Sequence, residues 1–177
     1  ACLLPLADIF GFGKVYASRK AAVMPKSLLI IAHAPSVNTS ALADAALAGA
    51  THPYAGQIAA VLKSPFDVAA DDLRACDGVI IGTTENIGYM AGATKDMFDR
   101  CYDDWLDRHE AMPVGIYIRA GRDGTATRRA LESIIGALRW RLVAAPLILH
   151  GDWQDAYRDQ VSELAMGMAA GMDAGIF

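Results

Sequence analysis

The strongest restriction on the fold of this chain comes from a continuous apolar run at residues 28–32, which ends at His33 before a proline-containing turn. A strand that is apolar at every position is buried on both faces, whereas a strand with one solvated face alternates apolar and polar residues. Strands of the first kind belong to parallel sheets covered by helices on both sides. A second such run occupies residues 79–82. The sequence therefore predicts an α/β fold built on a buried parallel sheet.

Strand and helix patterns alternate along the rest of the chain. Strands are expected at residues 27–33, 57–62, 79–82, 113–118 and 142–150, and helices at residues 39–50, 71–77, 92–108, 125–139 and 153–177. Pro146 places the last strand at an edge of the sheet, and Gly78 is expected to cap the short second helix. Five strands in this alternation favour the order 2-1-3-4-5, with a ligand at the carboxyl ends near the switch point.

Composition narrows the functional classes. Of the 177 residues, 54% are apolar, so one domain with a sizeable core can form. The net charge of −4 argues against nucleic acid as a partner. This charge is also small for an electron carrier that docks through a strongly acidic surface. The three cysteines have no metal-ligand spacing, no metal site is expected, and a reducing cytoplasm is the predicted compartment. No apolar run is long enough to cross a membrane.

The first 23 residues do not fit the pattern of the rest. They carry an apolar start whose basic residues come late, unlike a secretory signal. Met24 resembles a natural start, so we expect residues 1–23 to be an extension that the fold does not need and that the natural protein could lack. Residues 24–177 would then form the domain. The alternative is a short helix that packs on the outside of the domain.

The loop after the first strand offers hydroxyl and amide groups at a helix start. Its candidate binding residues are His33, Ser36, Val37, Asn38 and Thr39. Free backbone N–H groups and the positive end of the helix dipole suit a phosphate monoester without Lys or Arg. Capping of the helix by Asn38 or Thr39 explains the same residues equally well. His33 either touches the phosphate or is a hydrogen-bonded structural residue.

The loop after the third strand provides a family resemblance. It is similar to the matching loop of flavodoxin-like NAD(P)H-dependent FMN reductases and quinone reductases. The residues that carry the match are Gly82, Thr83, Met90, Gly92, Lys95, Phe98, Asp99 and Arg100. Thr84 stands where that family usually has proline, which leaves the loop less rigid. Lys95 and Asp99 are four apart on a helix, so we interpret them as a solvated ion pair.

The resemblance implies a flavodoxin-like three-layer sandwich that binds FMN. The flavin ring would lie against residues Thr83, Thr84, Glu85, Asn86, Ile87, Gly88 and Tyr89, whose N–H groups stabilise negative charge on the reduced ring. The loop after the fourth strand would lie beside the ring through Arg119, Ala120, Gly121 and Gly124. Arg119 or Arg122 could also meet an anionic group, whereas Arg128 and Arg129 are interpreted as solvated.

Three functions remain open at this point. The first is an FMN-dependent oxidoreductase that takes hydride from NADH or NADPH and reduces a small molecule such as a quinone, a nitro compound or a flavin. The second is a flavodoxin-type electron carrier without NAD(P)H activity, and the third is a relative that has lost its cofactor. No catalytic residue is identified. The family also implies a homodimer or homotetramer, with Trp105, Trp140 and Trp153 as interface or core residues.

Overall fold

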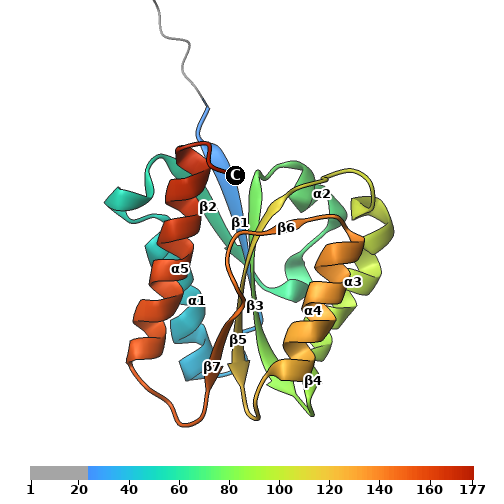
Figure 1. The fold of residues 1–177 in the computed structure, drawn as a ribbon, viewed down its shortest axis with the longest axis vertical. Helices are drawn as coiled ribbons and strands as arrows, with labels where there is room; N and C mark the ends of the chain where they lie inside the picture. The colour runs from blue at the N-terminus through green and yellow to red at the C-terminus, as the bar shows by residue number, and fades with distance from the viewer. Residues whose placement is uncertain (1–23) are drawn as a thin grey trace, which may run out of the picture.

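The computed structural model of the chain describes residues 24–177, so the expected extension at residues 1–23 lies outside the described part. Figure 1 shows a central sheet between two layers of helices. One face is covered by α1 (Val37–Ala50) and α5 (Ala156–Asp173), and the other by α2 (Ala70–Arg74), α3 (Gly92–Trp105) and α4 (Thr125–Ala137). Two short 3₁₀ helices, η1 (Pro53–Ala55) and η2 (Pro65–Asp67), flank the second strand. The predicted three-layer α/β architecture is confirmed.

The parallel sheet has the order β2-β1-β3-β5-β6. Its main strands are β2 (Ile58–Lys63), β1 (Lys26–Ala32), β3 (Gly78–Asn86) and β5 (Pro113–Ala120). The expected fifth strand is in two pieces, β6 (Arg141–Leu142) and β7 (Leu147–His150), and both pair in parallel with β5. Pro146 lies in the break between them, where the missing N–H costs no sheet hydrogen bond. The predicted order 2-1-3-4-5 is therefore confirmed.

The continuous apolar run of β1 is buried on both faces, as its pattern predicts. Leu29 and Ile31 pack on the side of α3 and α4, whereas Leu28 and Ile30 pack on the side of α1 and α5. These four side chains are between 0% and 4% exposed. Because β1 lies between β2 and β3, it has no solvated face that a polar residue could occupy.

The segment at residues 83–91 is a β-hairpin, and its prediction as a loop was wrong. β3 continues to Asn86 and pairs in an antiparallel manner with β4 (Tyr89–Met90). Ile87 and Gly88 form the turn with φ angles of 54° and 75°. Two consecutive positive φ angles match the tight turn whose twist suits a two-residue hairpin. Isoleucine disfavours this conformation, so the sequence shows no ordinary hairpin signal here.

Gly78 does not cap α2, contrary to the prediction. The helix ends at Arg74, and Gly78 is the first residue of β3. A Cβ at this position would lie 2.7 Å from the Met172 sulfur of α5, so close packing explains the glycine. Cys76 lies between the helix and the strand rather than inside the helix, while Cys101 is buried in α3 as expected.

Two of the three tryptophans are core residues rather than interface residues. Trp105 and Trp140 are 1% and 6% exposed, and their ring centroids lie 5.5 Å apart. Of the two alternatives left open by the sequence, core packing therefore holds for Trp105 and Trp140, which bury their rings between α3, α4 and the sheet. Trp153 is partly buried and packs edge-on against Tyr157. Within residues 24–177, no helix combines the length and the apolar character needed to cross a bilayer.

Candidate functional site

The candidate site is an open hollow of about 290 Å³ at the carboxyl ends of the parallel strands. The strands β1, β3 and β5 end at this edge of the sheet, which is the lower edge in Figure 1. Eight residues line the hollow: Ser36, Asn38, Thr39, Thr84, Glu85, Arg119, Ala120 and Gly121. All eight are among the residues that the sequence singled out, and they come from three separate segments. The structure therefore brings parts of all three predicted segments together around one space.

The first side of the hollow is the start of α1, which is closed by a capping box. Ser36 has an extended backbone, and its hydroxyl accepts the N–H of Thr39 at 3.3 Å. In return, the Thr39 hydroxyl accepts the N–H of Ser36 at 2.9 Å. The helix therefore begins at Val37, two residues earlier than predicted, and the cap is neither Asn38 nor Thr39. The sequence signal was a serine followed three residues later by a hydroxyl side chain.

This cap leaves donors for a ligand. The box occupies the N–H of Thr39, but the first N–H groups of a helix, here those of Val37 and Asn38, have no acceptor within the helix. The Asn38 side chain is exposed and lines the hollow. Together with the positive end of the helix dipole, these groups can bind an anion. Helix capping and anion binding are therefore compatible here, because they use different donors. The Val37 side chain itself is 86% exposed and does not line the hollow.

His33 lies at the end of β1 next to the site and does not line the hollow. Its N–H donates to the Gly82 carbonyl at 2.9 Å, which continues the pairing of β1 with β3. Burial lowers the pKa of the imidazole below its ordinary value of 6.5. The lowered pKa favours the neutral form of the imidazole at pH 7.

The second side of the hollow is the hairpin formed by β3 and β4. The Thr84 hydroxyl donates to the side-chain oxygen of Asn86 at 3.0 Å and lies beside Glu85 at the edge of the hollow. The Thr83 side chain turns the other way, because its hydroxyl is buried 2.8 Å from that of Thr94. Of the candidates in this segment, the structure therefore places Thr84 and Glu85 at the hollow and the Thr83 side chain in the core.

The tip of this hairpin is exposed and partly apolar. Ile87 has its whole side chain in solvent, and Tyr89 is 42% exposed. Asn86 and Gly88 complete the tip, and none of these four residues lines the hollow itself. They stand beside it as a rim, where they could contact a ligand that extends out of the hollow.

The third side of the hollow carries a fixed positive charge. The Arg119 guanidinium donates to the carbonyls of Ala120 at 2.7 Å, Leu149 at 2.9 Å and Gly151 at 2.5 Å. It also lies 5.6 Å from the centre of the Tyr157 ring. Within the described residues it has no carboxylate partner, so its charge is not neutralised by a neighbouring acid. Leu149, Gly151 and Tyr157 lie 30 or more positions away in sequence, so no local pattern predicts that they hold Arg119.

The two candidate glycines of this segment have different roles. A Cβ at Gly121 would meet no atom within 4 Å, so this residue leaves open space at the hollow. Gly124 has a φ of 69°, and a Cβ there would lie 2.8 Å from Ile148. The turn into α4 and close packing explain Gly124, which does not line the hollow. The Arg122 N–H donates to the Glu85 carboxylate at 2.6 Å and thereby joins this segment to the hairpin.

Other charged groups near this edge form ordinary surface pairs. Lys95 and Asp99 make the predicted ion pair on α3, and both side chains are largely exposed. Exposed pairs of this kind contribute about 0–1 kcal/mol to stability. Among residues 24–177, no group of three or more His, Cys, Asp or Glu side chains is arranged to hold a metal ion. The groups that line the hollow are backbone N–H donors, hydroxyls, one side-chain amide, one carboxylate and one guanidinium.

Comparison with known proteins places the fold. No family model matches the sequence, and no curated protein matches it. A flavodoxin from the domain Archaea superposes with a TM-score of 0.68 at 14% identity, covering 81% of this chain and 96% of that one. A WrbA-like flavodoxin from Agrobacterium tumefaciens superposes with a TM-score of 0.64 at 15% identity, and the match covers 82% of this chain and 95% of that one. Rubredoxin oxygen:oxidoreductase from Desulfovibrio gigas superposes with a TM-score of 0.69 at 13% identity, and the match covers 86% of this chain and 37% of that one. The chain therefore has a flavodoxin-like fold.

Proposed function

We propose that this chain binds FMN in the hollow and is an NAD(P)H-dependent oxidoreductase. The observation that carries the proposal is the meeting of three separate segments at one switch-point hollow. On one side are the free N–H groups of α1, and on another is the Arg119 guanidinium, which has no carboxylate partner. In open α/β sheets, ligands bind at the carboxyl ends of the strands near such a switch point. Flavodoxins among the structural neighbours support the choice of a flavin.

The residues present fit the parts of FMN. The N–H groups of Val37 and Asn38, with the Ser36 and Asn38 side chains, would hold the phosphate. The hairpin and the open space at Gly121 would receive the planar ring, and backbone N–H groups there would stabilise negative charge on it. When bound, FMN supplies the capacity to accept a hydride and pass on electrons, while the protein supplies position and electrostatics.

An enzyme is preferred to an electron carrier because the ring would have little aromatic cover. Tyr89 is the only Phe, Tyr or Trp in the three segments, at residues 33–39, 83–91 and 119–125. A ring that is not enclosed can be approached by the nicotinamide of NADH or NADPH and then by a small-molecule acceptor such as a quinone, a nitro compound or a flavin. The mild net charge of −4 points the same way.

We also propose a homodimer or homotetramer. The exposed apolar side chains of Ile87 and Val37 stand near the hollow, where a second copy could cover them. This part of the proposal is tested by the molar mass in solution, measured with and without FMN. A monomer under both conditions would contradict it without affecting the assignment of the cofactor.

Cofactor binding is tested with a charge placed at the proposed phosphate site. Asn38→Asp puts a carboxylate at the start of α1, where it suits the helix dipole but repels a phosphate. We expect FMN affinity to fall by about tenfold or more, since 1.4 kcal/mol corresponds to a factor of ten. Riboflavin, which lacks the phosphate, serves as the matched ligand and should bind both proteins equally. A wild-type protein that takes up no FMN contradicts the proposal.

Activity is tested on the FMN-loaded protein by following NADH and NADPH oxidation with a quinone. We expect turnover that depends on the quinone and disappears when FMN is removed. FMN binding without any NAD(P)H oxidation would favour the flavodoxin-type carrier. Equal turnover with free FMN alone, at the same concentration, would show that the protein contributes nothing to the reaction.

A further inference from the structure

The guanidinium of Arg122 stands beside the hollow with no charged partner. We propose that Arg122 determines substrate specificity by binding an anionic group on the planar molecule that exchanges electrons at this site. The proposal rests on the function proposed above and goes further, because it specifies the chemistry of the substrate. The shared chemistry is a planar apolar ring system that carries a phosphate, carboxylate or sulfonate.

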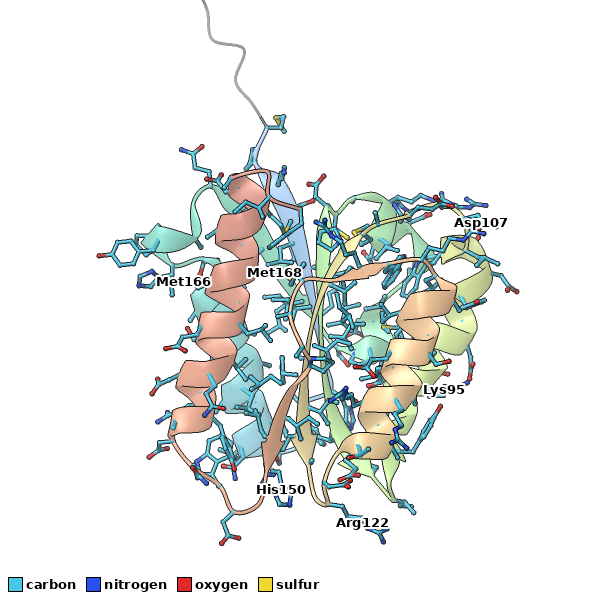
Figure 2. The ribbon with its side chains drawn as sticks, in the orientation of Figure 1. Lys95, Asp107, Arg122, His150, Met166 and Met168 are labelled. Carbon is cyan, nitrogen blue, oxygen red and sulfur yellow. The ribbon has the colours of Figure 1, made fainter. Side chains whose placement is uncertain are left out.

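The backbone of Arg122 is fixed, whereas its side chain is exposed. Its N–H donates to Glu85 at 2.6 Å, which holds the residue against the hairpin. The guanidinium reaches the hairpin turn, because a Cβ at Gly88 would lie 4.0 Å from Arg122 Nη1. Figure 2 shows the Arg122 side chain beyond the ends of the strands, at the same edge as His150. Because the backbone is already held, binding a ligand would have to order only the exposed side chain.

The charge of Arg122 is unpaired within the described residues. The Glu85 carboxylate accepts the backbone N–H of Arg122 and forms no ion pair with its guanidinium. Most other arginines have carboxylate, carbonyl or ring partners: Arg74, Arg100, Arg119, Arg128, Arg139, Arg141 and Arg158. Arg108 and Arg129 are also without a carboxylate partner, but neither lines the hollow, and neither lies within 4 Å of a Cβ placed at Gly88. Arg122 is thus the unpaired guanidinium beside the site.

The neighbours of Arg122 define the rest of the ligand. Ile87 is wholly exposed and Tyr89 is 42% exposed, so the rim next to the guanidinium presents apolar surface. A guanidinium binds phosphate, carboxylate or sulfonate oxygens through parallel N–H donors. An apolar rim beside one unpaired cation suits a planar molecule with an anionic substituent better than it suits a neutral one.

Two molecules in the proposed reaction could supply the anion. The nicotinamide donor carries a pyrophosphate, and an acceptor quinone can carry a carboxylate or sulfonate. The experiment therefore uses FMN-loaded wild type, Arg122→Gln, Arg122→Lys and the control Arg129→Gln. Arg129 gives the same charge change from an exposed arginine on α4 that does not line the hollow. Each protein is assayed with 1,4-naphthoquinone and with its 2-sulfonate, at varied NADH.

If the acceptor carries the anion, Arg122→Gln lowers kcat/KM for the sulfonate by about tenfold relative to the neutral quinone. If the donor carries it, KM for NADH rises by a similar factor with both quinones. In either case Arg122→Lys, which keeps the positive charge, shows a smaller change than Arg122→Gln, and Arg129→Gln has the kinetic constants of the wild type. Unchanged values for Arg122→Gln in both arms, or equal changes in Arg129→Gln, overturn the inference. Absence of FMN binding in the wild type instead overturns the proposed function, so the two failures are distinct.

Discussion

Single residues at this site combine a structural hydrogen bond with a place in the lining of the hollow. The Ser36 hydroxyl accepts the N–H of Thr39, while the exposed side of the same serine lines the hollow. Glu85 likewise lines the hollow with a carboxylate that is already bonded to the Arg122 N–H. A substitution at either residue therefore has two measurable consequences, one for the stability of the apoprotein and one for the ligand.

Ser36→Ala removes the cap of α1. We expect the free energy of unfolding to fall by about 0.5–2 kcal/mol, because the Thr39 N–H loses its acceptor. Urea unfolding without FMN measures this change. Ser40→Ala is the matched control, since Ser40 is exposed one turn later and its hydroxyl makes no hydrogen bond within the described residues. Equal losses from the two variants would show that the capping box does not stabilise the helix.

Cys76 is expected to be an unreactive thiol. Burial is the main cause that raises its pKa to about 12, so the nucleophilic thiolate is scarce at pH 8. Cys101 is buried in α3, and burial raises the pKa of its thiol as well. In a Cys2→Ser protein, Ellman's reagent should label neither thiol in the native state and both after unfolding. Rapid labelling of the native protein would contradict the burial of these side chains.

The helices α1 and α5 depend on the close approach of their backbones at one point. A Cβ at Gly49 would lie 2.1 Å from the Ser162 carbonyl oxygen, so the helices could not stay at their present distance. We expect Gly49→Ala to lower the free energy of unfolding by about 1–3 kcal/mol. The same change at Gly167, an exposed position of α5 with open space around it, should raise stability by about 1 kcal/mol. Denaturant unfolding should therefore show a lower free energy of unfolding for Gly49→Ala and a higher one for Gly167→Ala. A change of the same sign in both variants would contradict the close contact between α1 and α5.

The hairpin of β3 and β4 contains a strained turn residue. Ile87 has a φ of 54°, which costs an L-residue with a branched side chain about 1–2 kcal/mol, and its side chain gains nothing by burial. Ile87→Asn creates an Asn-Gly turn, the preferred pair for this geometry. We expect the apoprotein to become more stable by about 1 kcal/mol.

The control for the hairpin is Ile176→Asn. Ile176 is 70% exposed and is not among the residues with positive φ, so its replacement should change stability little. Equal effects of both substitutions on thermal or denaturant unfolding would show that side-chain polarity, rather than backbone strain, is responsible. A loss of FMN affinity in Ile87→Asn alone would add a contact between this side chain and the flavin.

At the scale of the whole molecule, the core is complete without a ligand. Two apolar clusters fill the space on either side of the sheet, and of their buried members only Ala120 also lines the hollow. We therefore expect the apoprotein to fold on its own and FMN to add stability by mass action. FMN at one hundred times its dissociation constant adds about 2.7 kcal/mol, which for a chain of this size raises Tm by roughly 5–10 °C.

Riboflavin at the same concentration provides the comparison in that thermal experiment. It has the ring but not the phosphate, so it should shift Tm by clearly less than FMN if α1 holds the phosphate. Equal shifts would contradict a phosphate site at Val37 and Asn38. No shift with either ligand would argue against flavin binding in the hollow.

Much of this architecture could be predicted from local patterns. The apolar run at residues 28–32 predicted a strand buried on both faces, and alternating strand and helix patterns predicted the sheet order. Pro146 correctly placed the fifth strand at an edge. The residues that line the hollow could also be anticipated, because polar loops that follow neighbouring parallel strands must meet at the same edge of the sheet. Each of these inferences depends on residues close together in sequence.

Sequence alone determined the α/β class, the sheet order and the segments that meet at the hollow, because hydrophobic periodicity and strand direction are local properties. Only the tertiary structure decided that residues 83–90 form a hairpin, that Thr83 faces the core, and that Arg119 is held by carbonyls about 30 residues away. It also decided that Arg122 is left unpaired. These outcomes depend on strand register, on backbone φ and on contacts between distant segments. Their free energies arise only when the packed sheet and helices bring those segments together.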